Sequence, residues 1–382
     1  MSESADSLAQ RPQCGTKLTS VWNRQCPLSA HQPNPCVVFT ASRNLTMLIW
    51  RPELTLNILS FAAVSVGIYF IIAVALIVSE RPKALETSDG LYFTRITASG
   101  AFVSPETPEF ARKTYTARDG AELSYTHVKT EGSAGLPLII MIHGSGWFGG
   151  QFDRLAWALR DVAEVKAITL RGHGDRPVRR GDVDYIGQFE DDIADLMADD
   201  PREAILLGHS SGGGLVVRFA GGENGRKIGG AILLAPFLKH NAPTTRINSG
   251  GWAHVLTRRI VGLSMLNSAG IHWLDHMKMI QFNMPKSVLD GPLGDCATTS
   301  YSWRLNTSFA PRSNYIADVA ELPPFLLVAG AQDEAMEADR YGPLMSTVTD
   351  KGNYHVINGA AHLDIVDAPE TEALIRDYLD SV

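Results

Sequence analysis

The sequence predicts an α/β protein with a mostly parallel central sheet, helices on both faces of the sheet and an inserted cap, preceded by one transmembrane helix. From about residue 111 to the end, short apolar runs alternate with amphipathic stretches, as parallel strands joined by crossover helices require. The alternation lapses over about residues 240–312 and then resumes, which indicates the cap. An uncharged apolar run over residues 58–78 predicts the membrane helix.

Composition limits the classes of protein that are possible. Hydrophobic residues make up 45% of the 382 residues and charged residues 20%, which allows a large core. The formal net charge of −7 argues against a nucleic-acid partner, because phosphate binding needs a basic face. A disulfide framework inside the main domain is excluded because only Cys296 lies there, and Cys14, Cys26 and Cys36 lack the C-x-x-C spacing of a zinc site. We expect no metal and no cofactor.

Four zones follow one another along the chain. Residues 1–46 are polar and interrupted by prolines, which predicts a disordered leader. One hypothesis is that translation begins at Met47. Residues 47–80 form the predicted anchor, residues 81–110 a proline-containing linker, and residues 111–382 the soluble domain.

The apolar run of the anchor is long enough to cross a bilayer. At about 1.5 Å per residue, some 21 residues span a hydrocarbon core of roughly 30 Å. A buried core helix and a cleaved signal peptide are the alternatives. We expect a single-pass membrane protein. Basic residues are nearly balanced before and after the run, so the sequence does not determine on which side of the membrane the catalytic domain lies.

Local patterns predict the elements of the soluble domain in order. A hairpin is expected at Asp119-Gly120. Expected strands cover residues 113–116, 122–128, 136–142, 165–170, 203–207, 228–234, 324–329 and 354–357. Expected helices cover residues 153–162, 185–197, 212–220, 337–346 and 369–378, and the acidic side of 185–197, with Asp191 and Asp192, is expected to face solvent.

A candidate nucleophile lies between a predicted strand and a predicted helix. The segment 204–213 reads AILLGHSSGG, with Ser210 at the centre of G-x-S-x-G. A serine on such a tight turn projects its hydroxyl towards substrate, and the glycines remove side chains that would collide there. We assign Ser210 as nucleophile; the adjacent Ser211 contributes its backbone only.

A glycine-rich loop after an apolar strand is the candidate oxyanion hole. The segment 142–147 reads IHGSGW. The backbone N–H groups of Ser145 and Ser211 are the expected donors to the tetrahedral intermediate, with Gly146 as the alternative to Ser145. His143 is expected to be a structural histidine that bonds backbone in the loop.

The base and its partner are expected after the last two strands. His362 follows the run VINGAA, and Asp333 follows the run LVAGAQ. A serine hydroxyl needs a base at neutral pH, and a carboxylate orients the imidazole of that base. Glu334 is the rival of Asp333. The order Ser, Asp, His along the chain is the one expected for a nucleophile elbow on this kind of sheet.

The chain resembles the α/β-hydrolase superfamily, and most closely its lysophospholipase and monoacylglycerol-lipase-like members. The matching motifs are HGSG at 143–146, RGHG at 171–174, GHSSGG at 208–213, GAQD at 330–333 and GAAH at 359–362. Ser211 departs from the pattern, because lipase-like members often carry methionine there. The resemblance implies a hydrolase fold and a Ser210–Asp333–His362 triad.

The predicted function is hydrolysis of carboxylic esters through an acyl-serine intermediate. Apolar residues in the cap and the membrane helix at 58–78 favour lipid esters such as acylglycerols or lysophospholipids as substrates. Thioesterase, amidase or aminopeptidase, and cofactor-free peroxidase activity could use the same triad. An inactive hydrolase-fold binding protein is the alternative outside enzymes.

Overall fold

The computed structural model describes residues 52–85, 108–130 and 135–381. The predicted leader, the Met47 start and most of the predicted linker lie outside these residues. Within them, the strands and helices of the soluble domain outside the cap follow one another in the predicted order, with α9 (Tyr315–Ala320) added before β10 (Phe325–Gly330).

The core is an eight-stranded sheet with the spatial order β1-β2-β4-β3-β5-β6-β10-β11. β1 and β2 form the predicted antiparallel hairpin, and β2 is antiparallel to β4. The six strands from β4 to β11 are all parallel. The strand bounds are Arg112–Thr116 (β1), Glu122–Val128 (β2), Leu138–Ile142 (β3), Glu164–Ile168 (β4), Ala204–His209 (β5), Ile228–Leu234 (β6), Phe325–Gly330 (β10) and Gly352–Ile357 (β11).

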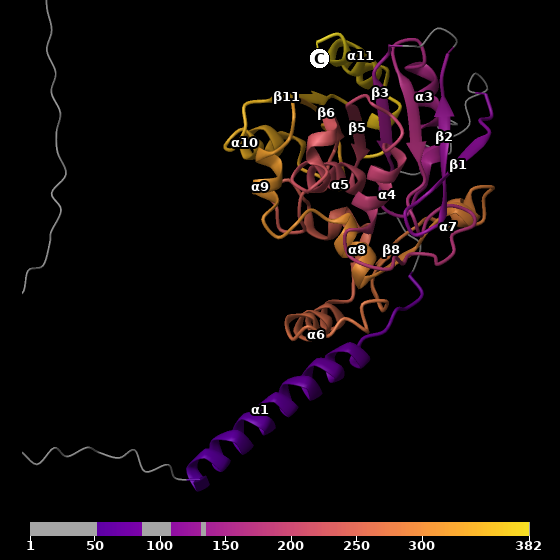
Figure 1. Ribbon diagram of the computed structural model, residues 1–382. Helices are drawn as coiled ribbons and strands as arrows, with labels where there is room; N and C mark the ends of the chain where they lie inside the picture. The colour runs from indigo at the N-terminus through magenta and orange to yellow at the C-terminus, as the bar shows by residue number, and fades with distance from the viewer. Residues whose placement is uncertain (1–51, 86–107, 131–134, 382) are drawn as a thin grey trace, which may run out of the picture. The chain divides into compact units, whose positions relative to one another are not determined.

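Helices between the strands cover the sheet (Figure 1). Every residue of β3, β5 and β10 is buried, which explains why these strands appear in the sequence as unbroken apolar runs. The predicted helices exist, although several are shorter than predicted, and a further helix, α9, was not predicted. The helix bounds are Asp153–Ala158 (α3), Gln188–Leu196 (α4), Ser211–Ala220 (α5), Tyr315–Ala320 (α9), Tyr341–Met345 (α10) and Pro369–Leu379 (α11).

The acidic side of α4 is not wholly solvated, so that prediction is wrong for Asp192. Its carboxylate is buried and accepts hydrogen bonds from Arg171 Nε at 3.0 Å and Nη2 at 2.7 Å. The same guanidinium also bonds Asp119 in the first hairpin. The pattern of apolar and polar residues in the sequence cannot distinguish a buried, paired carboxylate from a solvated one, because both occupy polar positions of the helix.

The cap lies between β6 and β10 and contains more strand than the sequence suggested. The predicted weak helical patterns correspond in part to a three-stranded antiparallel sheet in the order β7-β8-β9. Figure 1 shows α7, α8 and β8 gathered on one side of the core. The bounds are Ala253–Val255 (β7), Thr257–Ser268 (α6), Lys278–Phe282 (β8), Lys286–Leu289 (α7), Ser300–Ser302 (β9) and Trp303–Phe309 (α8).

The predicted membrane helix is a single helix, α1, over Pro52–Ser79. It begins six residues before the predicted run and extends one residue beyond it. Residues Glu53–Ser79 are long and apolar enough to cross a membrane by length and composition, and few of them are buried. Exposed leucine, isoleucine, valine and phenylalanine side chains on a helix of this length are costly in water, and a lipid environment removes that cost.

Candidate active site

Ser210 occupies a strained turn between β5 and α5. Its backbone has φ 54° and ψ −119°, a conformation that costs a non-glycine residue about 1–3 kcal/mol. A Cβ at Gly208 would collide with the backbone of Gly212, as the sequence predicts for a tight elbow. A Cβ at Gly212 would instead collide with the Ile142 carbonyl, so this glycine lets α5 approach β3. The half-buried Ser210 occupies the N-cap position of α5, and its side chain makes no capping hydrogen bond there.

His362 and Asp333 form a buried hydrogen-bonded pair on the loops after β11 and β10. His362 Nδ1 lies 2.8 Å from Asp333 Oδ2, and both side chains are almost fully buried. Asp333 Oδ1 accepts the backbone N–H groups of Ala335 at 2.8 Å and Met336 at 2.7 Å. The carboxylate therefore holds the proton of the imidazole on Nδ1 and leaves the Nε2 lone pair free for a hydroxyl proton.

Two other carboxylates near His362, those of the rival Glu334 and of Asp364, accept hydrogen bonds from backbone N–H groups. Glu334 Oε2 accepts the backbone N–H of His362 at 3.0 Å. Asp364 Oδ2 accepts the backbone N–H of Ala361 at 3.0 Å. Both groups thus fix the loop that carries the imidazole, whereas Asp333 contacts the ring itself.

The surroundings of His362 change its proton affinity in two directions. Burial lowers the pKa of the imidazole, but the charge and hydrogen bond of Asp333, with the charge of Glu334, outweigh burial and raise the pKa above its ordinary value. An imidazolium formed during a reaction would be stabilised by the same two carboxylates.

The glycine-rich loop after β3 approaches the elbow. A Cβ at Gly144 would lie 3.3 Å from Ser210 Cβ, and Ser145 Oγ lies 2.5 Å from Ser211 Oγ. Among the described residues, no turn or loop hydrogen bond uses the N–H of Ser145 or Ser211. The alternative donor, Gly146 N–H, already bonds Tyr301 Oη at 2.6 Å, so the contacts favour Ser145 over Gly146.

His143 has the structural contacts expected for it. Its Nε2 accepts the backbone N–H of Leu170 at 3.1 Å, so its Nδ1 carries the proton and donates to the Gly144 carbonyl at 2.8 Å. Burial lowers the pKa of His143 to about 4. A neutral histidine with both nitrogens occupied has no capacity left for proton transfer.

A chain of buried hydrogen bonds that the sequence analysis missed joins three segments of the site. Gln151 Oε1 accepts Gly144 N–H at 3.2 Å, and Gln151 Nε2 lies 2.7 Å from His209 Nδ1. His209 Nε2 lies 2.9 Å from the His362 carbonyl oxygen. Since a carbonyl only accepts, His209 donates through Nε2 and accepts from Gln151 through Nδ1. The position of His209 inside G-x-S-x-G was a signal for this role; Gln151 had none.

Tyr301 of β9, which the sequence did not mark either, connects the cap to the candidate oxyanion loop, the glycine-rich segment 143–147 after β3. Its buried hydroxyl accepts Gly146 N–H and lies 2.7 Å from His173 Nε2. His173 Nδ1 lies 3.0 Å from the Arg171 carbonyl, so Nε2 is the acceptor and Tyr301 donates to it. Thr298 N–H also donates to the Gly146 carbonyl at 2.9 Å. Both backbone polar groups of Gly146 are therefore bonded to the cap.

The predicted site residues gather at one edge of the sheet. Ser145, Ser210, Asp333 and His362 follow the carboxyl ends of parallel strands β3, β5, β10 and β11. The rings of His209 and His362 lie 4.8 Å apart between centroids, which brings the histidine loop beside the residue that precedes Ser210. No hydrogen bond between Ser210 Oγ and His362 is present in the described part of the chain.

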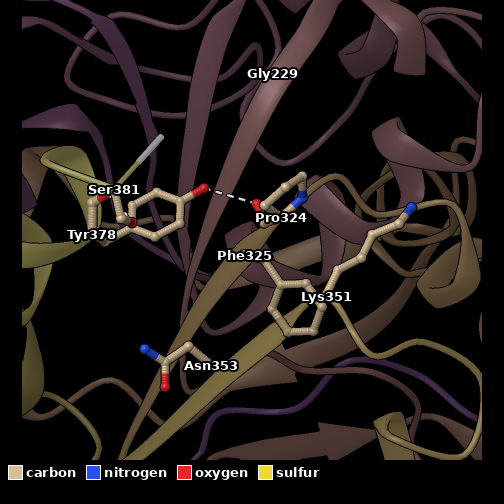
Figure 2. A pocket seen from close by; sticks show the side chains of 7 residues that line it. All are labelled: Gly229, Pro324, Phe325, Lys351, Asn353, Tyr378 and Ser381. Carbon is tan, nitrogen blue, oxygen red and sulfur yellow. Dashed lines mark hydrogen bonds between the residues drawn. The ribbon is translucent and has the colours of Figure 1, made fainter.

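An open depression of about 430 Å³ lies at the other edge of the sheet. Figure 2 shows the Tyr378 hydroxyl directed at the Pro324 carbonyl, 2.7 Å away. The lining residues sit at the amino ends of β6, β10 and β11 or in α11 and its end, so this depression is separate from the candidate site; they are Gly229, Pro324, Phe325, Lys351, Asn353, Tyr378 and Ser381.

Residues 139–373, more than half of the chain, match the family described as "Alpha/beta hydrolase family". The chain therefore belongs to the α/β-hydrolase family, as the motifs indicated. It is 35% identical over 124 residues to a protein named "Non-heme chloroperoxidase CPO-A1" from Kitasatospora aureofaciens. That match covers 31% of this chain and 42% of the chloroperoxidase, so the chain spans less than half the length of this relative.

Solved structures share the fold at low identity. A soluble variant of monoglyceride lipase from Saccharomyces cerevisiae aligns with a TM-score of 0.57 and 15% identity, over 73% of this chain and 96% of the lipase. Monoacylglycerol lipase from Paleococcus ferrophilus aligns with a TM-score of 0.52 and 19% identity, over 68% and 99%. These likenesses concern the fold.

Proposed function

We propose that this chain is a membrane-anchored serine hydrolase that cleaves carboxylic esters through an acyl-serine intermediate. The observation that carries the proposal is the 2.8 Å bond between His362 Nδ1 and Asp333 Oδ2, at the sheet edge where Ser210 occupies the strained elbow. Membership of the α/β-hydrolase family supports hydrolase activity in general.

Each residue has one proposed role. The Ser210 hydroxyl attacks the ester carbonyl as His362 Nε2 takes its proton, and Asp333 stabilises the resulting imidazolium. The N–H groups of Ser145 and Ser211 donate hydrogen bonds to the negatively charged oxygen of the tetrahedral intermediate and stabilise it. The imidazolium then protonates the leaving alcohol, and water releases the acyl group in a second round of the same chemistry.

Lipid-like esters are the proposed substrates, acylglycerols or lysophospholipids among them. Support comes from α1, which as a single-pass anchor would hold the site beside a source of lipid. The cap supports it too, because Met284 and Trp252 lie next to Gly146: a Cβ built on Gly146 would be 3.2 Å from Met284 Cε and 3.4 Å from Trp252 Cζ2. Apolar cap side chains beside the oxyanion loop suit an acyl chain.

A cofactor-free peroxidase is the second candidate, because the chloroperoxidase relative matches part of this chain. It would use the same acyl-serine, with hydrogen peroxide replacing water in the second step. Thioesterase or amidase activity and an inactive binding role have no observation in their favour.

Turnover of p-nitrophenyl esters by the full chain in detergent tests the proposal. Ser210→Ala should lower kcat by at least about 10⁴-fold, whereas Ser211→Ala should lose far less because its backbone N–H remains. Equal loss in the two variants, or retained turnover in Ser210→Ala, would refute the assignment. Competition by a panel of lipid esters, and peroxide-dependent halogenation of a dye, then separate the two candidates.

A further inference from the structure

The cap helix α6 packs directly on the last third of α1. Ala73 and Ile77 of α1 are buried against Leu263 and Leu266 of α6. Gly262 permits this close approach, because a Cβ there would lie 2.5 Å from the Ala73 carbonyl oxygen and 2.7 Å from Ile77 Cγ1. Small residues at a helix crossing allow backbones to approach in this way.

The two helices run in opposite directions. The Tyr69 hydroxyl donates to the Met265 carbonyl at 2.8 Å, near the end of α6. Eleven residues later, the Glu80 carboxylate accepts the backbone N–H groups of Arg258 and Arg259, at the start of α6. The end of α6 is therefore directed back along α1, towards the part of α1 that precedes Tyr69.

Buried polar contacts fix this arrangement. Arg259 is 5% exposed, and its guanidinium donates to three carbonyls: Ile77 at 3.3 Å, Glu80 at 2.6 Å and Lys278 at 2.8 Å. The Glu80 carboxylate meanwhile supplies an acceptor for two N–H groups in the first turn of α6. The last turn of α1, α6 and β8 are therefore held together as one unit.

The length of α1 sets the depth of this unit in a bilayer. Its 28 residues extend about 42 Å at 1.5 Å per residue, roughly 12 Å more than the hydrocarbon core. Because α6 covers the last third of α1, we place the hydrocarbon core on the uncovered part of the helix, which begins at Pro52 and not at the predicted Ile58. Tyr69 then stands about 26 Å from the start of the core, close to its far boundary. Contacts with α6 begin at this residue, so the end of α6 lies at the level of the lipid headgroups.

The segment after α6 has the side chains of a membrane interface. Ile271 and Leu274 pack against the α1–α6 cluster, whereas Trp273 between them is 78% exposed. Val261 on α6 is also exposed. An exposed tryptophan is costly in water but favoured at the headgroup level of a bilayer.

We propose that residues 261–277 of the cap are a lipid-docking surface, with Trp273 inserted at the bilayer interface beside α1. This inference rests on the membrane anchor in the proposed function but not on the ester chemistry. It places the cap, which also bonds the oxyanion loop through Tyr301, in direct contact with the lipid surface.

Brominated-lipid quenching of the full chain in phosphatidylcholine vesicles tests the proposal. The chain has seven tryptophans, so the signal of Trp273 is taken as the difference between wild type and Trp273→Phe. Bromines on the acyl carbons nearest the glycerol should quench this difference signal strongly. The matched variant Trp157→Phe, on α3 of the core, should remove a signal that the brominated lipids do not quench.

Two outcomes would overturn the proposal directly: a Trp273 signal that the brominated lipids do not quench, or vesicles that do not retain the chain on flotation. A third is a Trp273 signal that is protected from quenching at a high ratio of protein to lipid and loses this protection when the protein is diluted into excess lipid. That result would indicate a second copy of the chain as the occupant of the surface. Gly262→Ala should reduce the quenching, whereas Gly67→Ala, where a Cβ meets nothing within 4 Å, should not. Ser210→Ala should leave the quenching unchanged, so failure of the ester chemistry is recognised separately.

Discussion

The eight-stranded core and the cap hold the candidate site in different ways. The core positions Ser210, Asp333 and His362 on loops that follow buried parallel strands, so their places are determined by the sheet. The cap reaches the site through a few polar contacts, chiefly those of Tyr301 and Thr298 with Gly146. The comparison teaches that the proposed triad depends on the core, whereas the shape of the candidate oxyanion loop depends on both regions.

The largest effect is expected from Asp333→Asn in the core. An amide cannot hold the His362 proton on Nδ1, so kcat should fall by about 10⁴-fold with little change in fold. Steady-state ester hydrolysis measures the loss. A fall of less than tenfold would mean that Glu334 or another group orients the imidazole.

A second change in the core, Gln151→Met, should have an intermediate effect. It leaves Gly144 N–H and His209 Nδ1 without the partners they now have, which should lower the free energy of unfolding by about 1–3 kcal/mol. Because the oxyanion loop and the His362 loop lose their common connection, we also expect kcat to fall by roughly 10–100-fold.

The control for Gln151→Met is Gln188→Met. Gln188 is a buried glutamine of α4 that accepts Asp184 N–H and donates to Asp119, outside the site. It should lose comparable stability at unchanged kcat. If both variants keep full kcat, the Gln151–His209 connection is only structural.

In the cap, Tyr301→Phe should lower kcat by less than about tenfold, because the ring still fills its place and only the hydroxyl contacts with Gly146 N–H and His173 Nε2 are lost. Tyr378→Phe is the matched control, since this hydroxyl also accepts a backbone N–H, from Ala231, and donates to a carbonyl, at the other edge of the sheet. Equal kcat in the two variants would show that the cap does not shape the oxyanion loop.

The smallest effect is a pH shift. Catalysis needs neutral His362, and Asp333 with Glu334 raises its pKa against the opposing effect of burial, so kcat/KM should rise with pH through a midpoint above that of ordinary imidazole. Glu334→Gln removes one negative charge and keeps an acceptor for His362 N–H, so the midpoint should move to lower pH. A shift to higher pH would contradict the electrostatic account.

The sequence predicted the core far better than the cap, for a physical reason. Strands such as Leu138–Ile142 are buried on both faces and therefore appear as continuous apolar runs. β7 and β9 have three residues each, too few for alternation to be visible, and their pairing depends on residues far along the chain. The fold and the family could be predicted because each buried strand and the motif after it form a local pattern in the sequence.

The residues of the candidate site also differ in how well the sequence predicts them. The positions of the proposed residues Ser210, Asp333 and His362 at the strand ends could be predicted, because glycines and apolar strands mark them. Gln151 and Tyr301 could not, because their importance lies in hydrogen bonds to Gly144 and Gly146 that only tertiary structure reveals.

The most direct test of the central claim, that Ser210 is an activated nucleophile, is to treat the full chain with a fluorophosphonate and locate the adduct by peptide mass spectrometry. The account predicts one adduct on Ser210 in the wild type and almost none in His362→Gln, because the base that activates the hydroxyl is absent. An adduct on Ser211 or another serine, or labelling that is independent of His362, would contradict it.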